Sequence, residues 1–481
     1  MPLILPGNVA SALGGGYEVA NSLRVNENDS PRLHKTNGTP TSRRKFTFSC
    51  WVKRASLDEE SDMHMIFNFN GNSNRFYVGF FGDKLRVNAT KSGDGTTAMD
   101  LKTNRMFRDF SSWYHICVAI DTEQGTAANR AKIYINGIQE TSFATETYPA
   151  EDDDIHVNES DVELLEFTNA AVHFFDGYIA EIVYVDGTQE AVTSFGEFDE
   201  DSPTIWKPKN VSGLTFGTNG FYLDFEDSSN LGNDANGGTD FTEVNIAAID
   251  QSTDTPTNNF CTFNPLFGAE TQAVNTTFSE GNLAVVNSGS VYNPYGTTIG
   301  VNKGKWYAEF KANANMGDGN IGIFAKLGAS GDALSSQTQQ YSWYFTASAG
   351  NIRSGGSNIV TSVGTIAAND IIGIALDCNN SKLYMHKNGT YISNGTGTGN
   401  PSSGTNGISI TDPDDTDLGV YFMTAMDWGG STRGNWFANF GSPSFTISSS
   451  NSDANGYGSF EHSVPSGYLA ICTKNLGSDG G

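Results

Sequence analysis

Short segments in which apolar and polar residues alternate recur along most of this 481-residue chain. In residues 46–54 (FTFSCWVKR), the side chains of Phe46, Phe48, Cys50 and Val52 fall on one side, which is the period of a half-buried β-strand. Turn residues separate such segments, and glycine is abundant, with 54 residues in the chain. Aromatic residues make up 12% of the sequence. This composition favours short strands around ring-filled cores. The pattern predicts an all-β protein with little helix, and further strands are expected at 113–121, 132–136, 174–186, 305–311, 321–327, 370–377, 382–386 and 435–440.

A hairpin pattern occurs in both halves of the chain. In each half an apolar strand ends on an aspartate, Asp121 or Asp377, and leads into a Lys-x-Tyr strand that closes on an Asn-Gly turn, at 136–137 or 388–389. A chain of this length is too long for one β-sandwich. We therefore expect two tandem jelly-roll-like β-sandwiches, each with its own core.

The strand patterns divide the chain into five parts. The segment between the two strand-rich regions is dominated by turn formers and contains one expected strand at 220–225. We expect it to pack on the first sandwich and to lead into the second. The predicted parts are an N-terminal extension at 1–20, a first sandwich at 21–198, a connector at 199–280, a second sandwich at 281–476 and a tail at 477–481.

Charge and cysteine content argue against several classes of protein. The formal net charge of −26 repels phosphate backbones, so no nucleic-acid partner is expected. The five cysteines are widely spaced, which argues against a disulfide framework and against a zinc site. The extension lacks a basic start and is interrupted by Pro2 and Pro6, so it does not resemble a signal peptide. No apolar stretch of 18 residues occurs, and no membrane insertion is expected.

Motifs that carry catalysis are absent from the sequence. It contains no nucleophile elbow, metalloprotease helix or phosphate-binding loop. The nearest pair of acids at alternate positions is Asp224 and Glu226, which lie beside turn residues, while Glu181 and Glu309 are isolated strand acids. Glycoside hydrolysis requires two carboxyl groups that converge in a cleft. The sequence therefore predicts a chain that is not an enzyme.

Carboxylate-rich loops are the best indication of a metal. Hard oxygen ligands from such loops suit Ca²⁺, which is the one cofactor that the sequence brings into consideration. The same runs are also typical of solvated acidic loops, and neither has EF-hand spacing, so both interpretations stay open. The candidate Ca²⁺ ligands are Asp152, Asp153 and Asp154 in the first half, and Asp412 and Asp414 in the second.

Aromatic residues near turn signals are candidates for binding. Trp428 and Trp436 flank a glycine-rich stretch that contains Arg433, and Tyr292 and Tyr295 lie in the segment VYNPYG. An aromatic flank with a single arginine suits recognition of a ligand or a partner protein. The alternative is that the tryptophans hold their loop against the sandwich. Trp51, Trp113 and Trp306 fall inside strand patterns, so we expect them in the cores.

Motifs at defined positions carry a resemblance to known families. The first region contains F-T-F-S-x-W-V-K at 46–53, W-Y-H-I-x-V-x-I-D at 113–121, K-I-Y-I-N-G at 132–137 and F-D-G-Y-I-A-E-I at 175–182. It resembles a concanavalin-like laminin-G domain. The second region contains G-K-W-Y-A-E at 304–309, I-G-I-A-L-D at 372–377, N-F-G-S-P-S-F at 439–445 and G-Y-L-A-I-C-T-K-N-L at 467–476. It resembles a SPRY domain.

The whole chain is similar to proteins of marine tailed bacteriophages, in which these two modules follow each other after a similar start, MPLILPGNV. This resemblance implies a virion structural appendage that assembles in the host cytoplasm, is exposed on the released particle and recognises a host-surface glycan or protein. It also implies other virion proteins as partners, with the extension as a docking segment or a cover for its own domain, and a homo-oligomer such as a trimer. The alternatives are a decoration protein that only stabilises the particle, and an enzyme that degrades surface polysaccharide.

Overall fold

A computed structural model of the chain divides it into two units between Thr257 and Asn258. The N-terminal unit and the C-terminal unit are considered separately below. The segment expected as a connector is shared between them, because residues 199–257 belong to the N-terminal unit and residues 258–280 to the C-terminal unit. The structure describes residues 16–57, 63–69, 74–158, 161–167, 173–268, 276–287, 295–313, 316–317, 319–325, 341–427 and 434–477.

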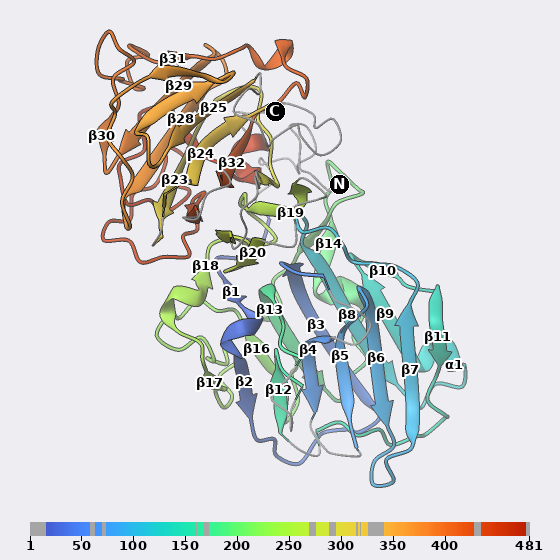
Figure 1. Cartoon of the computed structure of the whole chain (residues 1–481). Helices are drawn as coiled ribbons and strands as arrows, with labels where there is room; N and C mark the ends of the chain where they lie inside the picture. The colour runs from blue at the N-terminus through green and yellow to red at the C-terminus, as the bar shows by residue number, and fades with distance from the viewer. Residues whose placement is uncertain are drawn as a thin grey trace. The chain divides into compact units, whose positions relative to one another are not determined.

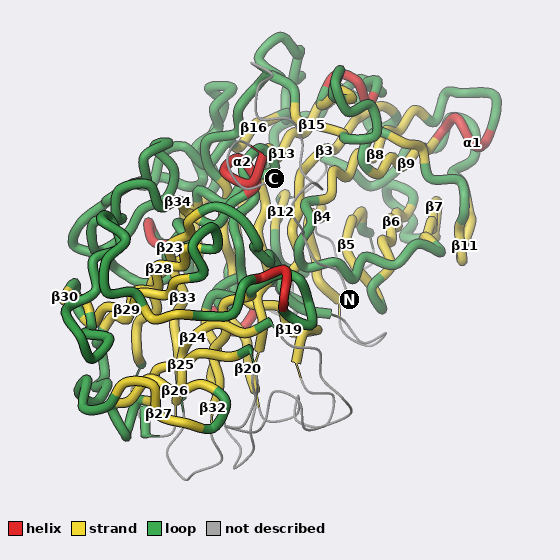
Figure 2. The backbone as a smooth tube through the Cα atoms, turned by 90° about the horizontal axis from the view of Figure 1, so that it is seen from above, coloured by secondary structure: helices red, strands yellow, loops and turns green. Residues whose placement is uncertain are grey.

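The N-terminal unit consists of two antiparallel sheets that form two layers (Figure 2). The first sheet has the order β10 (Ile138–Gln139), β9 (Ala131–Ile135), β8 (Tyr114–Asp121), β3 (Lys45–Arg54), β13 (Gly177–Asp186), β1 (Ser22–Val25) and β18 (Gln251–Ser252), with β16 (Phe221–Leu223) also paired to β13. The second has the order β11 (Phe143–Thr147), β7 (Thr97–Thr103), β6 (Lys84–Thr90), β5 (Phe76–Phe81), β4 (Met63–Phe69), β12 (Val162–Leu164), β2 (Arg32–Lys35) and β17 (Thr242–Val244).

Aromatic rings from both sheets fill the core of the N-terminal unit. Phe48 on β3 stacks on Phe67 of β4 with ring centroids 4.3 Å apart, and both side chains are fully buried. The outer face of the first sheet is covered as well, by the hairpin of β14 (Gly196–Phe198) and β15 (Trp206–Pro208). Trp206 donates a hydrogen bond of 3.1 Å from its indole nitrogen to Nδ1 of the buried His115. His115 is therefore a structural residue of this layer.

The C-terminal unit repeats the two-sheet arrangement. One sheet has the order β19 (Phe263–Gly268), β22 (Tyr295–Thr297), β32 (Phe422–Asp427), β24 (Gly319–Phe324), β25 (Ser342–Thr346), β26 (Asn351–Ser354) and β27 (Ser357–Val360). The other has the order β20 (Thr276–Ser279), β21 (Ala284–Asn287), β33 (Asn435–Asn439), β23 (Lys305–Ala312), β28 (Ile371–Asp377), β29 (Lys382–Lys387) and β30 (Thr390–Tyr391), with β31 (Ile408–Ser409) on β29 and β34 (Leu469–Ala470) parallel to β23.

Two layers of apolar packing surround the second sheet of the C-terminal unit. Between the sheets, Phe310 of β23 meets Phe263 of β19 with ring centroids 6.2 Å apart. On the opposite face, the chain from residue 441 to 472 folds back and buries Tyr307, Tyr384 and Tyr468. This second layer ends at β30, where the sheet ends, and the candidate site lies there.

Helix is confined to single turns among the described residues (Figure 2). These are α1 (Ala127–Arg130), α2 (Thr473–Asn475) and the 3₁₀ turns Glu27–Asp29, Val192–Ser194, Ala248–Asp250 and Pro413–Asp415. Over the described part of the chain, no helix has the length and apolar character needed to cross a membrane. The structure confirms the predicted fold class, an all-β chain with two tandem jelly-roll-like sandwiches (Figure 1).

Candidate ligand-binding site in the C-terminal unit

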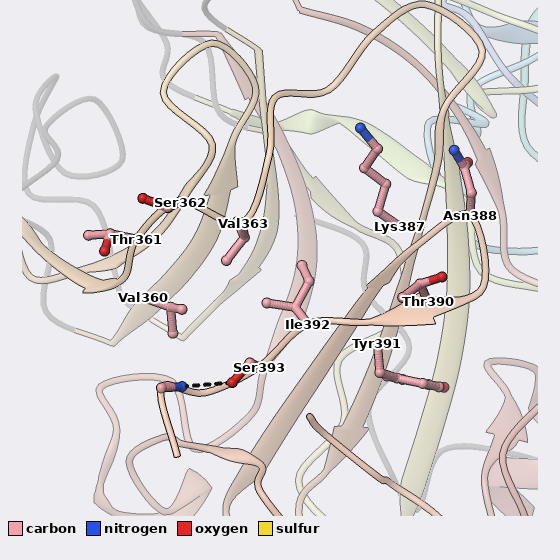
Figure 3. A pocket seen from close by; sticks show the side chains of 11 residues that line it. Val360, Thr361, Ser362, Val363, Lys387, Asn388, Thr390, Tyr391, Ile392 and Ser393 are labelled. Carbon is pink, nitrogen blue, oxygen red and sulfur yellow. Dashed lines mark hydrogen bonds between the residues drawn. The ribbon is translucent and has the colours of Figure 1, made fainter. Parts of the chain in front are cut away.

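Two hollows in the C-terminal unit share one side chain, that of Tyr391. The first hollow has a volume of about 600 Å³ and lies between residues 360–363, which follow β27, and residues 387–395 around β30 (Figure 3). The second hollow has a volume of about 380 Å³ and is lined by Tyr391, residues 398–402 and residues 463–466. Volumes of this size are typical of sites for small ligands.

Local sequence explains why Tyr391 lies at this point. The Asn-Gly turn after β29 has positive φ at both residues, +51° at Asn388 and +81° at Gly389, which is the turn that an Asn-Gly pair adopts readily. The turn brings β30 back along β29, so that Tyr391 is paired with His386. The two rings meet edge to face with centroids 5.2 Å apart. Tyr391 is therefore held at the end of the sheet by its cross-strand neighbour.

The walls of both hollows combine polar and apolar groups and, among the described residues, are nearly free of charge. In the second hollow the lining side chains are neutral, with hydroxyl or amide groups on Thr398, Asn400, Ser402, Ser463 and Ser466. In the first hollow the one charged lining residue is Lys387, whose ammonium group already contacts the Thr365 carbonyl at 2.6 Å and Asp370 at 3.0 Å. Val363 and Ile392 point toward each other across the first hollow (Figure 3). The arrangement suits a neutral ligand with both apolar and hydroxyl groups.

A buried polar network lies behind β30 and is built around Glu309. The Glu309 side chain is fully buried on β23, and its Oε1 accepts hydrogen bonds from the Tyr307 hydroxyl at 2.9 Å and the His462 backbone amide at 2.8 Å. Its Oε2 accepts from the Glu461 amide at 2.8 Å and from Asn439 at 3.4 Å. Nδ1 of His462 lies 3.1 Å from Oε1. The carboxylate is thus surrounded by donors from its own chain, which compensates for its burial.

Glu309, His386 and His462 form the one group of three potential metal ligands found among the described residues, with ligand atoms within 4.8 Å of one another. The hydrogen bonds do not fit a metal centre. The Gly389 amide donates to Nδ1 of His386 at 3.1 Å, so the proton of this neutral imidazole is on Nε2, 2.7 Å from the Tyr307 oxygen. Burial, and then the nearby His462, lowers the pKa of His386 to about 3. His386 therefore donates a hydrogen bond to the Tyr307 oxygen, and the Tyr307 hydroxyl donates one to Glu309. The imidazole offers no lone pair toward the other two residues of the group.

The predicted binding aromatics that the structure describes are core residues. Tyr295 is 2% exposed on β22, and Trp436 is 1% exposed on β33, and both belong to the core between the sheets. A ring buried to this extent cannot stack on a ligand, so their prediction as a binding surface is corrected. Tyr292, Trp428 and Arg433 lie outside the described residues.

The predicted calcium ligands of the first half have cationic partners within the protein. Asp152 and Asp154 both contact Arg44, at 3.0 and 2.7 Å, and Asp153 contacts the ammonium group of Lys91 at 2.9 Å. The three carboxylates of the acidic run thus form ion pairs with two cationic side chains, Arg44 and Lys91.

The predicted calcium ligands of the second half lie at a 3₁₀ turn. Asp412 accepts a hydrogen bond from the Asp414 amide at 3.1 Å and one from the Ser381 hydroxyl at 3.2 Å. Asp414 is exposed. Asp412 therefore caps the turn Pro413–Asp415, and these two residues join no group of three potential metal ligands among the described residues.

Sequence reasoning did not identify Tyr391 as a site residue. The Lys-x-Tyr strand and the Asn-Gly turn at 388–389 were read as a fold signal, and the same turn places Tyr391 between the hollows. The two strand acids singled out from the sequence, Glu181 and Glu309, are both engaged by hydrogen bonds from their own chain. Glu181 accepts hydrogen bonds from the hydroxyls of Tyr222 at 2.9 Å and Tyr17 at 3.1 Å, and Glu309 is enclosed by its own network.

Comparisons with known proteins give one match to a family model and several matches to solved structures. Residues 27–188 match the model of the concanavalin A-like lectin/glucanases superfamily. Solved structures similar to parts of the chain include the SPRY domain of human HERC1, with 16% sequence identity and a TM-score of 0.28 over 37% of this chain and 96% of that one. A heptameric SAP-like pentraxin from Limulus polyphemus matches with 14% identity and a TM-score of 0.27, over 37% of this chain and 82% of that one.

The structure of a "putative carbohydrate binding protein" from Bacteroides ovatus matches with 13% identity and a TM-score of 0.31. That match covers 47% of this chain and 58% of the other chain. No curated protein sequence matches this chain. The concanavalin-like content of the N-terminal unit is thus supported by a family model, while the similarities to solved structures identify no ligand.

Proposed function

We propose that this chain is a non-catalytic recognition protein of a tailed-bacteriophage particle, and that it contacts the host surface through the two hollows beside Tyr391. The chemistry of these hollows is the observation that carries the binding role. They share an aromatic ring, their walls present hydroxyl and amide groups, and none of the residues that line them is acidic. Such walls can hold a ligand, and the one charged group described among them, the Lys387 ammonium group, is already paired with Asp370 at 3.0 Å.

The state of the buried acids supports a role without catalysis. Glycoside hydrolysis uses two carboxyl groups that face the scissile bond, roughly 5–10 Å apart. Glu309 is fully buried on β23, and its two oxygens accept hydrogen bonds from four groups of its own chain, which are the Tyr307 hydroxyl, the backbone amides of Glu461 and His462, and the Asn439 side chain. A carboxylate engaged in this way has no free position for a substrate proton or a nucleophilic attack.

The phage setting rests on the sequence. The order of a laminin-G-like and a SPRY-like module after the start MPLILPGNV supports a surface-exposed appendage, assembled in the host cytoplasm and carried on the released particle. In this proposal the extension at 1–20 docks on a neighbouring virion protein, and the chain forms a trimer. Labelling of purified particles with an antibody against this chain, viewed by electron microscopy, tests the location. Label at a vertex, the collar or the tail supports the proposal, and unlabelled particles contradict it.

Host recognition is tested by incubating the purified chain with cells of the strain on which the particle grows. Ser463→Trp places a large side chain in the second hollow, and Ser403→Trp is the matched control, because Ser403 is equally exposed but lines neither hollow. We expect the wild type and Ser403→Trp to bind cells and Ser463→Trp to lose binding. If the wild type does not bind and particles without the chain adsorb normally but resist heat less well, the decoration role is favoured instead.

A further inference from the structure

The ring of Tyr391 is the structural element common to both hollows. It is half-buried, and its edge-to-face contact with His386 at 5.2 Å holds its orientation. His386 is itself held from both sides, by the Gly389 amide on Nδ1 and by the Tyr307 hydroxyl on Nε2. The ring is therefore preorganised before any ligand arrives, which reduces the entropy lost on binding.

The hydroxyl of Tyr391 lies on the protein side of the ring. It is buried and has no hydrogen-bond partner among the described residues. Burial, and then the carboxylate of Glu309, raises the pKa of Tyr391, so the hydroxyl stays protonated at neutral pH. In Figure 3 the side chain extends away from Val360 and Ile392. A ligand in the hollows therefore meets the ring and not the hydroxyl.

The groups around this ring match the chemistry of a sugar. Resting on the proposed function, we infer that the Tyr391 ring is a stacking platform for a neutral saccharide chain that spans both hollows. A pyranose presents an apolar C–H face, which packs on an aromatic ring, and a rim of hydroxyls that need polar partners. Those partners are available on both sides of the ring, from Thr390 and Ser393 in the first hollow and from Asn400 and Ser463 in the second.

Charge selects a neutral chain over an acidic one. The only cation lining either hollow is Lys387, which is paired with Asp370 at 3.0 Å, and the whole chain carries a formal charge of −26. An anionic sugar would meet repulsion without a compensating ion pair. Because Tyr391 lines both hollows, affinity is expected to rise with saccharide length until both are filled.

The test uses the full chain and isothermal titration calorimetry. The probes are galactose, mannose and the cello- and malto-oligosaccharides of one to four rings, with N-acetylneuraminic acid as the acidic comparison. The variants are Tyr391→Ala and Tyr391→Phe, and the matched control is Tyr134→Ala, which removes a half-buried tyrosine ring from β9 of the N-terminal unit. Melting curves establish that each variant is folded.

We expect at least one neutral series to bind, with longer members binding more tightly. Tyr391→Ala should weaken binding at least tenfold, while Tyr391→Phe, which keeps the ring, and Tyr134→Ala should stay within threefold. Failure of all neutral probes to bind, tighter binding of the acidic probe, or equal losses for Tyr391→Phe and Tyr391→Ala would overturn the inference. Cell binding that survives Tyr391→Ala would leave host recognition standing and remove the stacking site. Saccharide binding without cell binding would support the stacking site and contradict host recognition.

Discussion

The backbone amide of Gly389 donates a hydrogen bond of 3.1 Å to Nδ1 of His386, and this contact assigns the tautomer of a buried histidine. With the proton on Nε2, the imidazole donates to Tyr307, which donates to Glu309. The group of Glu309, His386 and His462 resembles a metal centre in composition, yet its hydrogen bonds already use the atoms that a metal would need.

Zinc is therefore expected to leave the protein unchanged. Equimolar Zn²⁺ should not shift the melting temperature, and the His386 ring should stay neutral across pH 5–8, because burial lowers its pKa to about 3. The ring signal, identified by its loss in His386→Gln, can be followed by NMR against pH. A rise in melting temperature with Zn²⁺ that disappears in His386→Gln would show that the tautomer assignment is wrong.

Gly373 on β28 leaves the space that the His386 ring occupies. A Cβ at this position would lie 1.9 Å from Nε2 of His386, and this ring cannot move aside without breaking its bonds to Tyr307 and Gly389. Gly373→Ala should therefore destabilise the C-terminal unit by about 1–3 kcal/mol, as overpacking of a core does. Gly213→Ala is the control, since no atom lies within 4 Å of its Cβ position. Equal unfolding midpoints for the two variants in denaturant would contradict the packing described here.

The sequence was sufficient for the strands because their alternation is local. Residues 46–54 were expected as a strand and form β3, and the turn at 388–389 was expected and is present. Burial of a given ring is not local. Trp436 is covered because β33 pairs with Val285 of β21 and Ala312 of β23, residues more than a hundred positions away. The residues next to Trp436 in the sequence give no sign of that strand pairing. Because glycines lie nearby, the segment around Trp436 has the pattern of a loop.

Long-range contacts also explain why the sequence did not predict the candidate site. Asp154 is neutralised by Arg44, which lies 110 positions earlier, so an acidic run that suggested Ca²⁺ has its cation from a distant part of the sequence. The second hollow is built from Tyr391, residues 398–402 and residues 463–466. Each piece is an ordinary turn or strand end in sequence. Only the return of residues 441–472 across the outer face of the sheet brings them together.

Glu181 makes stability depend on pH. It lies at a bulge of β13 with φ of +51°, and burial, with Asp224 and Glu226 nearby, raises its pKa from 4.5 to about 7 despite the hydrogen bonds from Tyr222 and Tyr17. Because the folded state holds this proton more tightly than the unfolded state, its contribution is complete below pH 4.5 and is lost as the pH rises through 7. A shift of this size corresponds to roughly 2–4 kcal/mol.

Glu181→Gln should remove that dependence. Its gain in stability over the wild type should be small at pH 4 and grow up to about pH 7, then level off, as measured by calorimetric melting at each pH. The exposed acid Glu151 provides the control, because Glu151→Gln removes the same charge from the surface of the same unit. A gain that is independent of pH would mean that the pKa of Glu181 is the same in the folded and the unfolded protein.

Two ion pairs of the N-terminal unit should differ sharply in their contribution to the free energy of unfolding. Lys53 and Asp254 meet at 2.7 Å with both side chains 1% exposed, and Trp113 donates to the same carboxylate at 3.1 Å. Asp254→Ala would leave the Lys53 charge buried without its counterion, which costs about 3–5 kcal/mol. Asp154→Ala breaks a pair with Arg44 whose side chains are 49% and 35% exposed, so water replaces the lost partner and the unfolding midpoint should not change.

Denaturant unfolding followed by tryptophan fluorescence measures both effects on the full chain. Asp254→Asn separates charge from shape, since it keeps the side-chain volume and an acceptor for Trp113 but removes the counterion of Lys53. We expect Asp254→Asn to be nearly as destabilising as Asp254→Ala, because the uncompensated ammonium group dominates the loss. A mild effect of Asp254→Asn would mean instead that the indole hydrogen bond, and not the ion pair, holds this part of the chain against β3.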